Sequence, residues 1–234
     1  MKIEVCANGF ESAFIANETG ANRIELCENL SVGGITPSRA MITRVLQEIG
    51  IETHVLIRPR AGDFCYSETE IITMIQDIEF CKIMGCNGIV SGILTSENNI
   101  DLLNTERLIE AAGKMEFTFH RAFDVCRNPL LALQQLNGLK VKRLLSSGQK
   151  SKAIDGIELL KALKTLSEEK IQIMPGGGIT PKNVFVFKEA GFEMVHFSAI
   201  KKEASANNEN LFIASVSGVS NARTILQIKK ILGV

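Results

Sequence analysis

The stretch FTFHRAFD, residues 117–124, shows most directly how this chain folds. Side chains alternate along a β-strand, so Phe117 and Phe119 share one face while Thr118 and His120 share the other. The apolar face suits packing against helices, and the polar face is then turned inward. Titratable side chains follow directly where this strand ends. The stretch therefore predicts a buried strand that carries functional groups at its carboxyl end.

The same local order recurs along the chain: a short apolar strand, a polar loop, an amphipathic helix, a glycine and the next strand. The glycines recur at intervals of roughly 25–35 residues, which is the length of one βα unit. Eight strands alternating with helices predict a parallel sheet, either open and doubly wound or closed as a (β/α)8 TIM barrel. The predicted strands are Ile3–Cys6, Arg23–Cys27, His54–Arg58, Gly88–Gly92, Glu116–His120, Lys142–Ser146, Ile171–Met174 and Met194–Phe197.

Near-equal units without a long linker favour the closed barrel, as one α/β domain over residues 1–234. The doubly wound alternative usually has a Gly-x-Gly-x-x-Gly motif after its first strand, and this chain has Cys6-Ala7-Asn8-Gly9-Phe10 there. Residues 201–219 are polar and lack a clear period. We expect them to form an irregular connection between the last strand and the last helix.

Composition excludes several classes of function. The chain has 234 residues, 45% of them hydrophobic, with 26 basic and 26 acidic side chains. Zero formal net charge argues against nucleic acid as a partner. No apolar run approaches the ~18 residues of a membrane span, and the N-terminus resembles a strand more than a signal peptide. The six cysteines include no Cys-x-x-Cys pair, so we expect reduced thiols in a cytoplasmic protein.

Titratable side chains converge at the carboxyl ends of the predicted strands, which form the functional face of such a barrel. The candidates for acid–base chemistry are Glu4, Glu25, Arg58, His120 and Asp124. Like charges raise a carboxyl pKa and an adjacent arginine lowers it, so the two glutamates could take different roles. The alternative is a structural ion-pair layer formed by Glu4, Glu25 and Arg58.

A glycine-rich loop follows the seventh strand. Backbone N–H groups before a helix can bind an anion, and barrels often bind phosphate near strands seven and eight. The candidate anion-binding residues are Arg58, Gly176, Gly177, Gly178 and Ser198. Three glycines are a weak signal without this position in the fold.

Thiols also gather at this face. Cys6, Cys27, Cys65 and Cys126 all fall at strand ends or in the loops that follow them. Soft thiolates suit Cu(I), with help from methionine such as Met174 or from histidine. The alternative is that these are small buried core residues.

Several of these segments together resemble the CutC family, named for copper homeostasis. The resemblance runs from residue 3 to about residue 199, and the region after Lys201 matches poorly. It is carried by Glu4-Val5-Cys6, Arg23-Ile24-Glu25-Leu26-Cys27, Gly33–Ser38, Ile57–Arg60, Gly62–Ser67, Phe119–Asp124 and Ser147–Lys150.

The resemblance implies a (β/α)8 barrel, a cytoplasmic location, a homodimer and a role in copper handling. It also implies that Cys6 and Cys27 are candidate Cu(I) ligands. Two hypotheses follow. One is a copper-binding protein. The other is a barrel enzyme that acts on a small anionic, possibly phosphorylated, substrate, since His120 and the acidic residues are more than copper binding requires.

Overall fold

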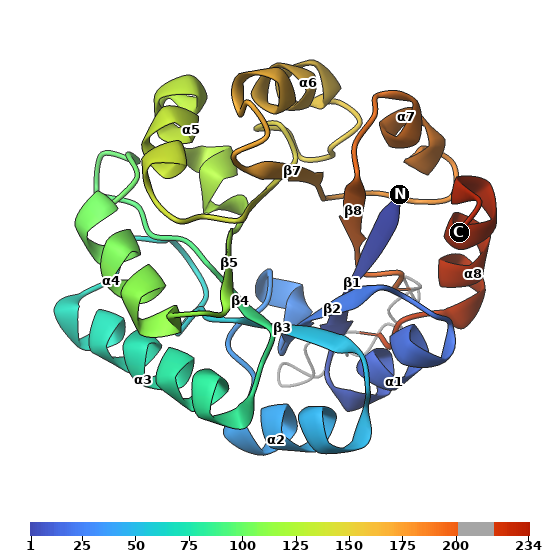
Figure 1. The fold of residues 1–234 in the computed structure, drawn as a ribbon, viewed down its shortest axis with the longest axis horizontal. Coiled ribbons are helices and arrows are strands. Elements are labelled where there is room, and N and C mark those ends of the chain that lie inside the picture. The colour runs from blue at the N-terminus through green and yellow to red at the C-terminus, as the bar shows by residue number, and fades with distance from the viewer. Residues whose placement is uncertain (201–217) are drawn as a thin grey trace, which may run out of the picture.

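The computed structural model describes residues 1–200 and 218–234. Eight parallel strands form a barrel, and helices surround them as an outer ring (Figure 1). The strand order is β7-β6-β5-β4-β3-β2-β1-β8, and an isolated parallel bridge between Gly176 and His196 joins the two ends of the sheet. The prediction of a (β/α)8 TIM barrel is therefore confirmed.

The strands are β1 Lys2–Asn8, β2 Arg23–Cys27, β3 Glu52–Leu56, β4 Gly88–Ser91, β5 Glu116–Phe119, β6 Arg143–Ser146, β7 Gln172–Pro175 and β8 Met194–Phe197. The helices are α1 Phe10–Glu18, α2 Arg39–Glu48, α3 Glu68–Met84, α4 Leu102–Ala112, α5 Pro129–Gly138, α6 Ile157–Leu166, α7 Val184–Glu189 and α8 Ala222–Leu232. Two short 3-10 helices, η1 Leu30–Val32 and η2 Arg121–Val125, follow β2 and β5.

Six of the eight predicted strands differ from the observed bounds by one or two residues, and the difference that matters for the site is at β3. The predicted strand His54–Arg58 ends at Leu56, so Arg58 lies beyond β3. The backbone N–H of Ile57 still bonds to Val90, but that of Arg58 donates to Thr36 Oγ1, and Pro59 follows. Because the ladder ends there, the Arg58 side chain belongs to the loops above the barrel rather than to its wall.

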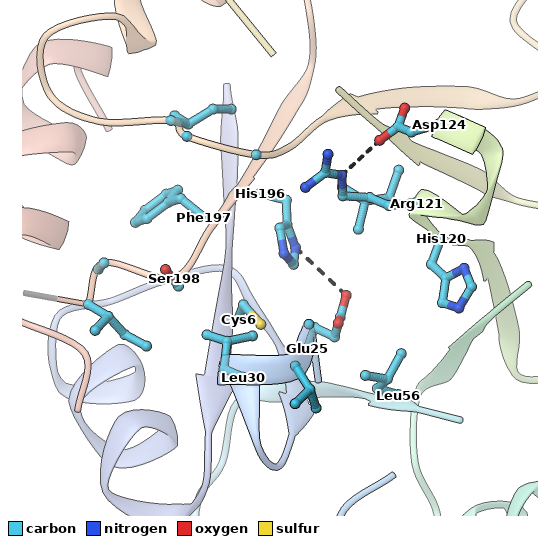
Figure 2. Close-up of a pocket in the computed structure, with 18 of the residues that line it drawn as sticks. Cys6, Glu25, Leu30, Leu56, His120, Arg121, Asp124, His196, Phe197 and Ser198 are labelled. Carbon is cyan, nitrogen blue, oxygen red and sulfur yellow. Dashed lines mark hydrogen bonds and ion pairs between the residues drawn. The ribbon is translucent and has the colours of Figure 1, made fainter. Parts of the chain in front are cut away.

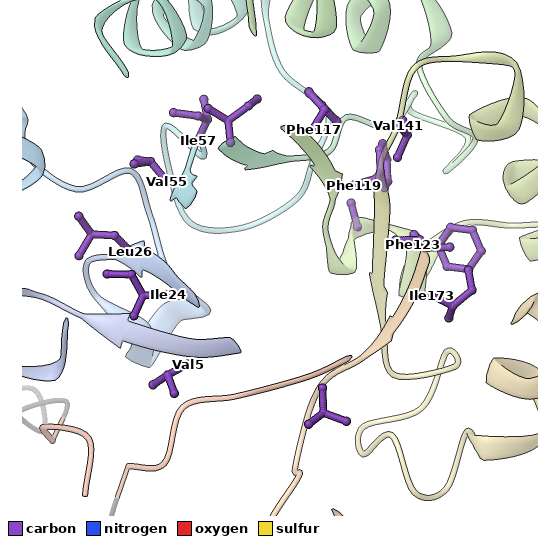
Figure 3. Packing of buried hydrophobic residues seen from close by; sticks show 14 of the residues in the cluster. Val5, Ile24, Leu26, Val55, Ile57, Phe117, Phe119, Phe123, Val141 and Ile173 are labelled. Atoms are coloured by element: carbon purple, nitrogen blue, oxygen red, sulfur yellow. The ribbon is translucent and has the colours of Figure 1, made fainter. Parts of the chain in front are cut away.

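The main hydrophobic core lies between the strands and the helices (Figure 3). Val5, Ile24, Leu26, Phe117 and Phe119 are fully or almost fully buried there. Each such side chain contributes about 1.5–3 kcal/mol on burial. Since outward positions are apolar, the alternate positions on the same strands point into the barrel, and these carry charges and thiols.

The predicted connection over residues 201–219 lies outside the described residues, apart from its last two positions. Among the helices of the described chain, none combines the length and the apolar character needed to span a bilayer.

Candidate functional site

A cavity of about 690 Å³ opens at the carboxyl ends of the strands. Its floor is formed by Cys6, Glu25 and His196, which come from β1, β2 and β8 (Figure 2). The loop after β5 contributes Arg121 to one side, and Ser198 lies on another. We refer to this region as the mouth of the barrel. It is where the predicted candidates were expected to meet.

The thiols of Cys6 and Cys27 face each other, with 3.5 Å between their Sγ atoms. Both side chains are buried, and Leu56 and Val90 pack around them in a small apolar cluster of their own. The hydrogen bond to Cys27, together with burial, raises the pKa of the Cys6 thiol well above its usual value. Both sulfurs therefore lie together inside the barrel, and Cys6 also reaches the cavity.

Glu4 lies deeper and is fully paired. Arg23 Nε donates to Glu4 Oε2 at 2.5 Å, and His196 Nδ1 lies 2.7 Å from Glu4 Oε1. Burial by itself would raise the pKa of Glu4, but Arg23 and the His196 hydrogen bond lower it well below its usual value. Glu4 is thus an ionised structural carboxylate whose position fixes the His196 ring.

An ion pair forms inside the barrel between Glu4 and Arg23, but the predicted layer of Glu4, Glu25 and Arg58 does not form among the described residues. The barrel register places Glu4 opposite Arg23 and Cys6 opposite Glu25. Arg23 shares the inward face of β2 with Glu25 and Cys27, so alternation alone would have found this residue. Its guanidinium also contacts the sulfurs of Met174 and Met194 at 3.7 and 3.0 Å.

Glu25 has a different environment from Glu4. Its Oε2 is buried without a hydrogen-bond partner in the described structure and lies 3.8 Å from His196 Nδ1. Burial raises the pKa of Glu25 to about 7, against the attraction of His196. Although burial lowers the pKa of His196, the carboxylates of Glu25 and Glu4 raise it above its usual value. Glu25 is therefore a group at the mouth whose protonation can change near neutral pH.

Arg58 supports the loops around the mouth. Its guanidinium donates to the carbonyl oxygens of Val32, Gly34 and Gly62 at 2.8–2.9 Å and lies over the Phe64 ring at 5.0 Å. Within residues 1–200 and 218–234 it forms no ion pair. Arg58 lines the cavity, but most of its donors are already used by backbone oxygens.

His120 is a buried, neutral hydrogen-bond donor. Its Nδ1 accepts from the backbone N–H of Ala122, so the ring proton must be on Nε2. Burial and the charge of Arg58 lower the pKa of His120 to about 3. No described group bonds to Nε2. His120 lines the cavity, where this tautomer could offer a hydrogen bond to an electron-rich atom.

Asp124 holds Arg121 in place at the rim. Its carboxylate accepts hydrogen bonds from Arg121 Nε at 2.7 Å, from the hydroxyls of Ser146 and Ser147, and from backbone N–H groups of Ser147 and Gln149. These donors occupy both carboxylate oxygens. We therefore assign Asp124 a positioning role.

The glycine-rich loop faces this arginine. Gly177 adopts a φ of +102°, and a Cβ atom there would lie 3.1 Å from Arg121 Nη1. Gly177, Gly178 and Ser198 line the cavity, whereas Gly176 continues the β7 ladder by bonding to Ser146. Helix α7 begins only at Val184 and has six residues, so this loop does not lead directly into a long helix.

Comparisons with known proteins identify the family. The CutC family model matches residues 1–201. A family protein CutC of Proteus mirabilis is 45% identical over 207 residues, covering 88% of this chain and 82% of the relative. The corresponding protein of Glaesserella parasuis is 40% identical and covers 100% of this chain and 97% of the relative. The chain belongs to the CutC family.

A solved CutC structure from Streptococcus agalactiae has the same fold. It superposes with a TM-score of 0.80 at 35% sequence identity, covering 85% of this chain and 98% of that chain. The segment that matches the family model, residues 1–201, contains almost all of the residues that line the mouth.

The remaining cysteines of this CutC-family chain lie apart from the Cys6–Cys27 pair. Cys65 is exposed on the loop after β3, outside the cavity lining. Cys126 is buried at the end of η2, where Gln149 Nε2 lies 3.6 Å from its sulfur. Among the described residues, only Cys6 and Cys27 bring two sulfurs together at the mouth. Met174, also considered as a sulfur ligand, contacts Arg23 instead.

Proposed function

We propose that this protein takes part in copper homeostasis by binding Cu(I) between Cys6 and Cys27. The observation that carries the proposal is the 3.5 Å separation of the two thiol sulfurs. Copper homeostasis is the role named for the similar Streptococcus agalactiae protein. Two buried thiols in an apolar cluster are a ligand set that favours a soft monovalent ion over harder divalent ions.

The spacing suits a shared metal ion. With metal–sulfur bonds of about 2.3 Å, two thiolate sulfurs lie about 3.8 Å apart at a tetrahedral angle and about 4.6 Å apart when the ion is two-coordinate and linear. The pair would therefore have to open by about 0.3–1.1 Å. Because the pKa of Cys6 is raised, its thiol is protonated at neutral pH and must lose the proton on binding. We expect Cu(I) affinity to increase with pH.

Competition with a chromophoric Cu(I) chelator under reducing conditions tests this proposal. The wild-type protein should bind one equivalent, and the Cys6→Ser, Cys27→Ser double variant should lose more than the roughly 10–100-fold that changes around a metal site usually cost. Cys81→Ser is the matched control, because Cys81 is a buried cysteine on α3. Equal affinity in the double variant and in this control would exclude the proposal.

A second candidate function is binding, and acid–base conversion, of a small anionic molecule. The observation that favours it is Arg121 Nη1, which faces Gly177 on the wall of a cavity far larger than a metal ion needs. Asp124 and Ser147 hold the guanidinium in one orientation. In this function Arg121 binds the anion, His120 donates a hydrogen bond and Glu25 exchanges the proton.

Inorganic sulfate and phosphate are suitable probes of this second function. A bound anion stabilises the folded state, by about 1.4 kcal/mol at ten times its Kd. The thermal midpoint should rise with either anion in the wild type and much less in Arg121→Lys, which keeps the charge but loses the paired contacts to Asp124 and Ser147. An equal rise in both proteins would point to general salt effects and reject the site.

The six free cysteines further support our proposal of a cytoplasmic location, where thiols stay reduced. We also propose a homodimer, following the family resemblance. Sedimentation of the purified protein tests the second point, and a single monomeric species at micromolar concentration would refute it.

A further inference from the structure

A second group of metal-binding side chains shares Cys6 with the thiol pair. Single ligand atoms of Cys6, Glu25 and His196 all lie within 4.8 Å of one another. The three residues come from three neighbouring strands, β2, β1 and β8, and form the floor of the cavity (Figure 2). Cys27 is not part of this group. The group therefore mixes sulfur, oxygen and nitrogen donors, unlike the sulfur pair beside it.

We propose that Cys6, Glu25 and His196 form a binding site for one Zn²⁺ ion, which shares Cys6 with the proposed Cu(I) pair but does not use Cys27. Zinc is bound by cysteine sulfur, histidine nitrogen and carboxylate oxygen, and sites that keep an open position use three protein ligands. Ligand atoms around a tetrahedral zinc ion lie about 3.3–3.8 Å apart, so the three side chains must close by roughly 1 Å.

The free oxygen of Glu25 is the first independent support. Glu25 is 5% exposed, and its Oε2 has no hydrogen-bond partner in the described part of the chain. A buried carboxylate oxygen without a partner is costly unless something else satisfies it. Within residues 1–200 and 218–234, His196 is the one basic side chain in ion-pair range of Glu25. A bound cation would satisfy this oxygen.

Glu4 supplies the second support, because it orients His196 in the way that metal-binding histidines are usually oriented. Since Glu4 is ionised and paired with Arg23, His196 Nδ1 must carry the proton and donate it to Glu4 Oε1. In the neutral ring the lone pair on Nε2 is then available to an ion, and metal binding displaces any proton on Nε2. A carboxylate–histidine pair of this kind sets the tautomer and increases the basicity of the ligand.

A comparable group at the other end of the barrel has the opposite character. Glu52, His54 and Glu116 also place ligand atoms within 4.8 Å of one another. There, however, Arg23 Nη1 lies 3.3 Å from Glu52, and Arg143 binds Glu116 directly. Two arginines already neutralise these carboxylates and repel a cation. We therefore assign the zinc site to the mouth and not to this group.

The position of the proposed ion has a functional consequence. An ion on the cavity floor leaves its fourth coordination position toward the 690 Å³ cavity, in which Arg121 and His120 are also exposed to a ligand. A zinc ion there would act as a Lewis acid on a carbonyl or phosphoryl oxygen. The ligand class that fits all three groups is a small molecule with one anionic group and one such oxygen.

Substitution with Co²⁺ tests the ligand set directly, because a cobalt–thiolate bond gives a charge-transfer absorption band. The metal-free wild-type chain should bind one equivalent of Co²⁺ with this band, and Zn²⁺ should displace it. Cys6→Ser should lose the band and Cys27→Ser should keep it. Glu25→Gln and His196→Gln should weaken Zn²⁺ binding by more than about 100-fold, measured by competition with a chromophoric chelator.

The variants also separate this proposal from the Cu(I) proposal. Cys27→Ser should lower Cu(I) affinity and retain Co²⁺, whereas Glu25→Gln should do the reverse. Loss of the Co²⁺ band in Cys27→Ser, or unchanged Zn²⁺ affinity in Glu25→Gln, would overturn the zinc site without affecting the copper pair. Glutamine resembles protonated glutamate in shape, so Glu25→Gln should fold, and circular dichroism checks this. If His196→Gln does not fold, Glu25→Gln decides the outcome.

Discussion

The two ends of the barrel interior contain the same types of charged side chain but pair them differently. At the amino ends of the strands, Glu4, Glu52 and Glu116 are bound by Arg23 and Arg143. At the carboxyl ends, the residues Glu25, Arg58 and His120 each retain a buried polar atom without a partner among the described residues. Among the described residues, His54 and Arg143 at the first end also retain atoms without a hydrogen-bond partner, but every carboxylate there is bound by arginine, whereas Glu25 at the second end is bound by none and is available to a ligand.

Electrostatics follow the same division. The pKa of Glu4 is held well below its usual value, whereas that of Glu25 is raised to about 7. Both glutamates are buried, so burial alone does not explain the difference. Arg23 is in direct contact with Glu4 and not with Glu25. In the register of β1 on β2, Glu25 lies level with Cys6, two residues beyond Glu4. This displacement takes its carboxylate out of contact with Arg23 and leaves it titratable.

The largest expected effect comes from comparing Glu4→Gln with Glu25→Gln. Removing one partner of a buried ion pair typically costs about 3–5 kcal/mol, and Glu4→Gln leaves Arg23 and His196 without their carboxylate. Glu25→Gln removes no such pair and should cost less than about 1 kcal/mol at pH 7. Urea unfolding of both variants measures the difference. Similar losses would show that the two ends do not differ as described.

A smaller effect is expected from the pH dependence of His120→Asn. The pKa of His120 is lowered to about 3 in the folded state, so the unfolded chain binds the proton first as the pH falls. The contribution of neutral His120 to the free energy of unfolding is complete above pH 6.5 and declines toward pH 3, with a loss of about 2 kcal/mol between pH 7 and pH 5. Asparagine keeps an acceptor for the Ala122 N–H, and the variant should lack this loss.

This measurement requires the wild type at each pH as its reference. Glu25 has a raised folded pKa, so its contribution to stability grows as the pH falls from 7 and opposes that of His120. His54 acts in the same direction as His120, because burial lowers its pKa also. Glu25 and His54 are present in both proteins, so their contributions cancel when the free energies of unfolding of the variant and the wild type are subtracted. If the free energy of unfolding changed with pH in the same way in the wild type and in His120→Asn, the assignment of His120 as neutral would be contradicted.

The smallest effect should come from a surface pair. Lys161 and Glu158 lie 3.0 Å apart on α6, but both are largely exposed. Exposed pairs of this kind contribute about 0.5 kcal/mol or less. Lys161→Met should therefore leave the urea midpoint nearly unchanged. A loss approaching that of Glu4→Gln would mean that burial is not what separates the interior charges from the surface charges.

Much of the fold was predictable from local sequence. Apolar and polar residues alternate in β5, which identified its inward face, and the recurring order of strand, loop, helix and glycine identified the other strands. The end of β3 was placed two residues too late, because the ladder ends where Arg58 bonds to Thr36, a residue 22 positions earlier. Such a long-range contact has no local signal.

The site was predictable only as a set of residues. Glu25, His120, Cys6 and Cys27 do converge at the mouth, as the carboxyl ends of parallel strands must. The sequence did not reveal the role of each of these residues. Asp124 was a candidate acid or base, but donors from the loop after β6 occupy it. The sequence placed Cys65 and Cys126 in loops at the carboxyl ends of the strands, but neither joins the Cys6–Cys27 pair.

The sequence by itself determined which side chains enter the barrel, because strand alternation and the order of βα units are local properties. Tertiary structure decided which of them meet. The register of β1 on β2 sets Glu4 against Arg23 and Cys6 against Glu25. That offset pairs one glutamate, leaves the other in a cavity and brings two sulfurs within 3.5 Å. Charge pairing and pKa depend on distance through space, and only the closed barrel defines that distance.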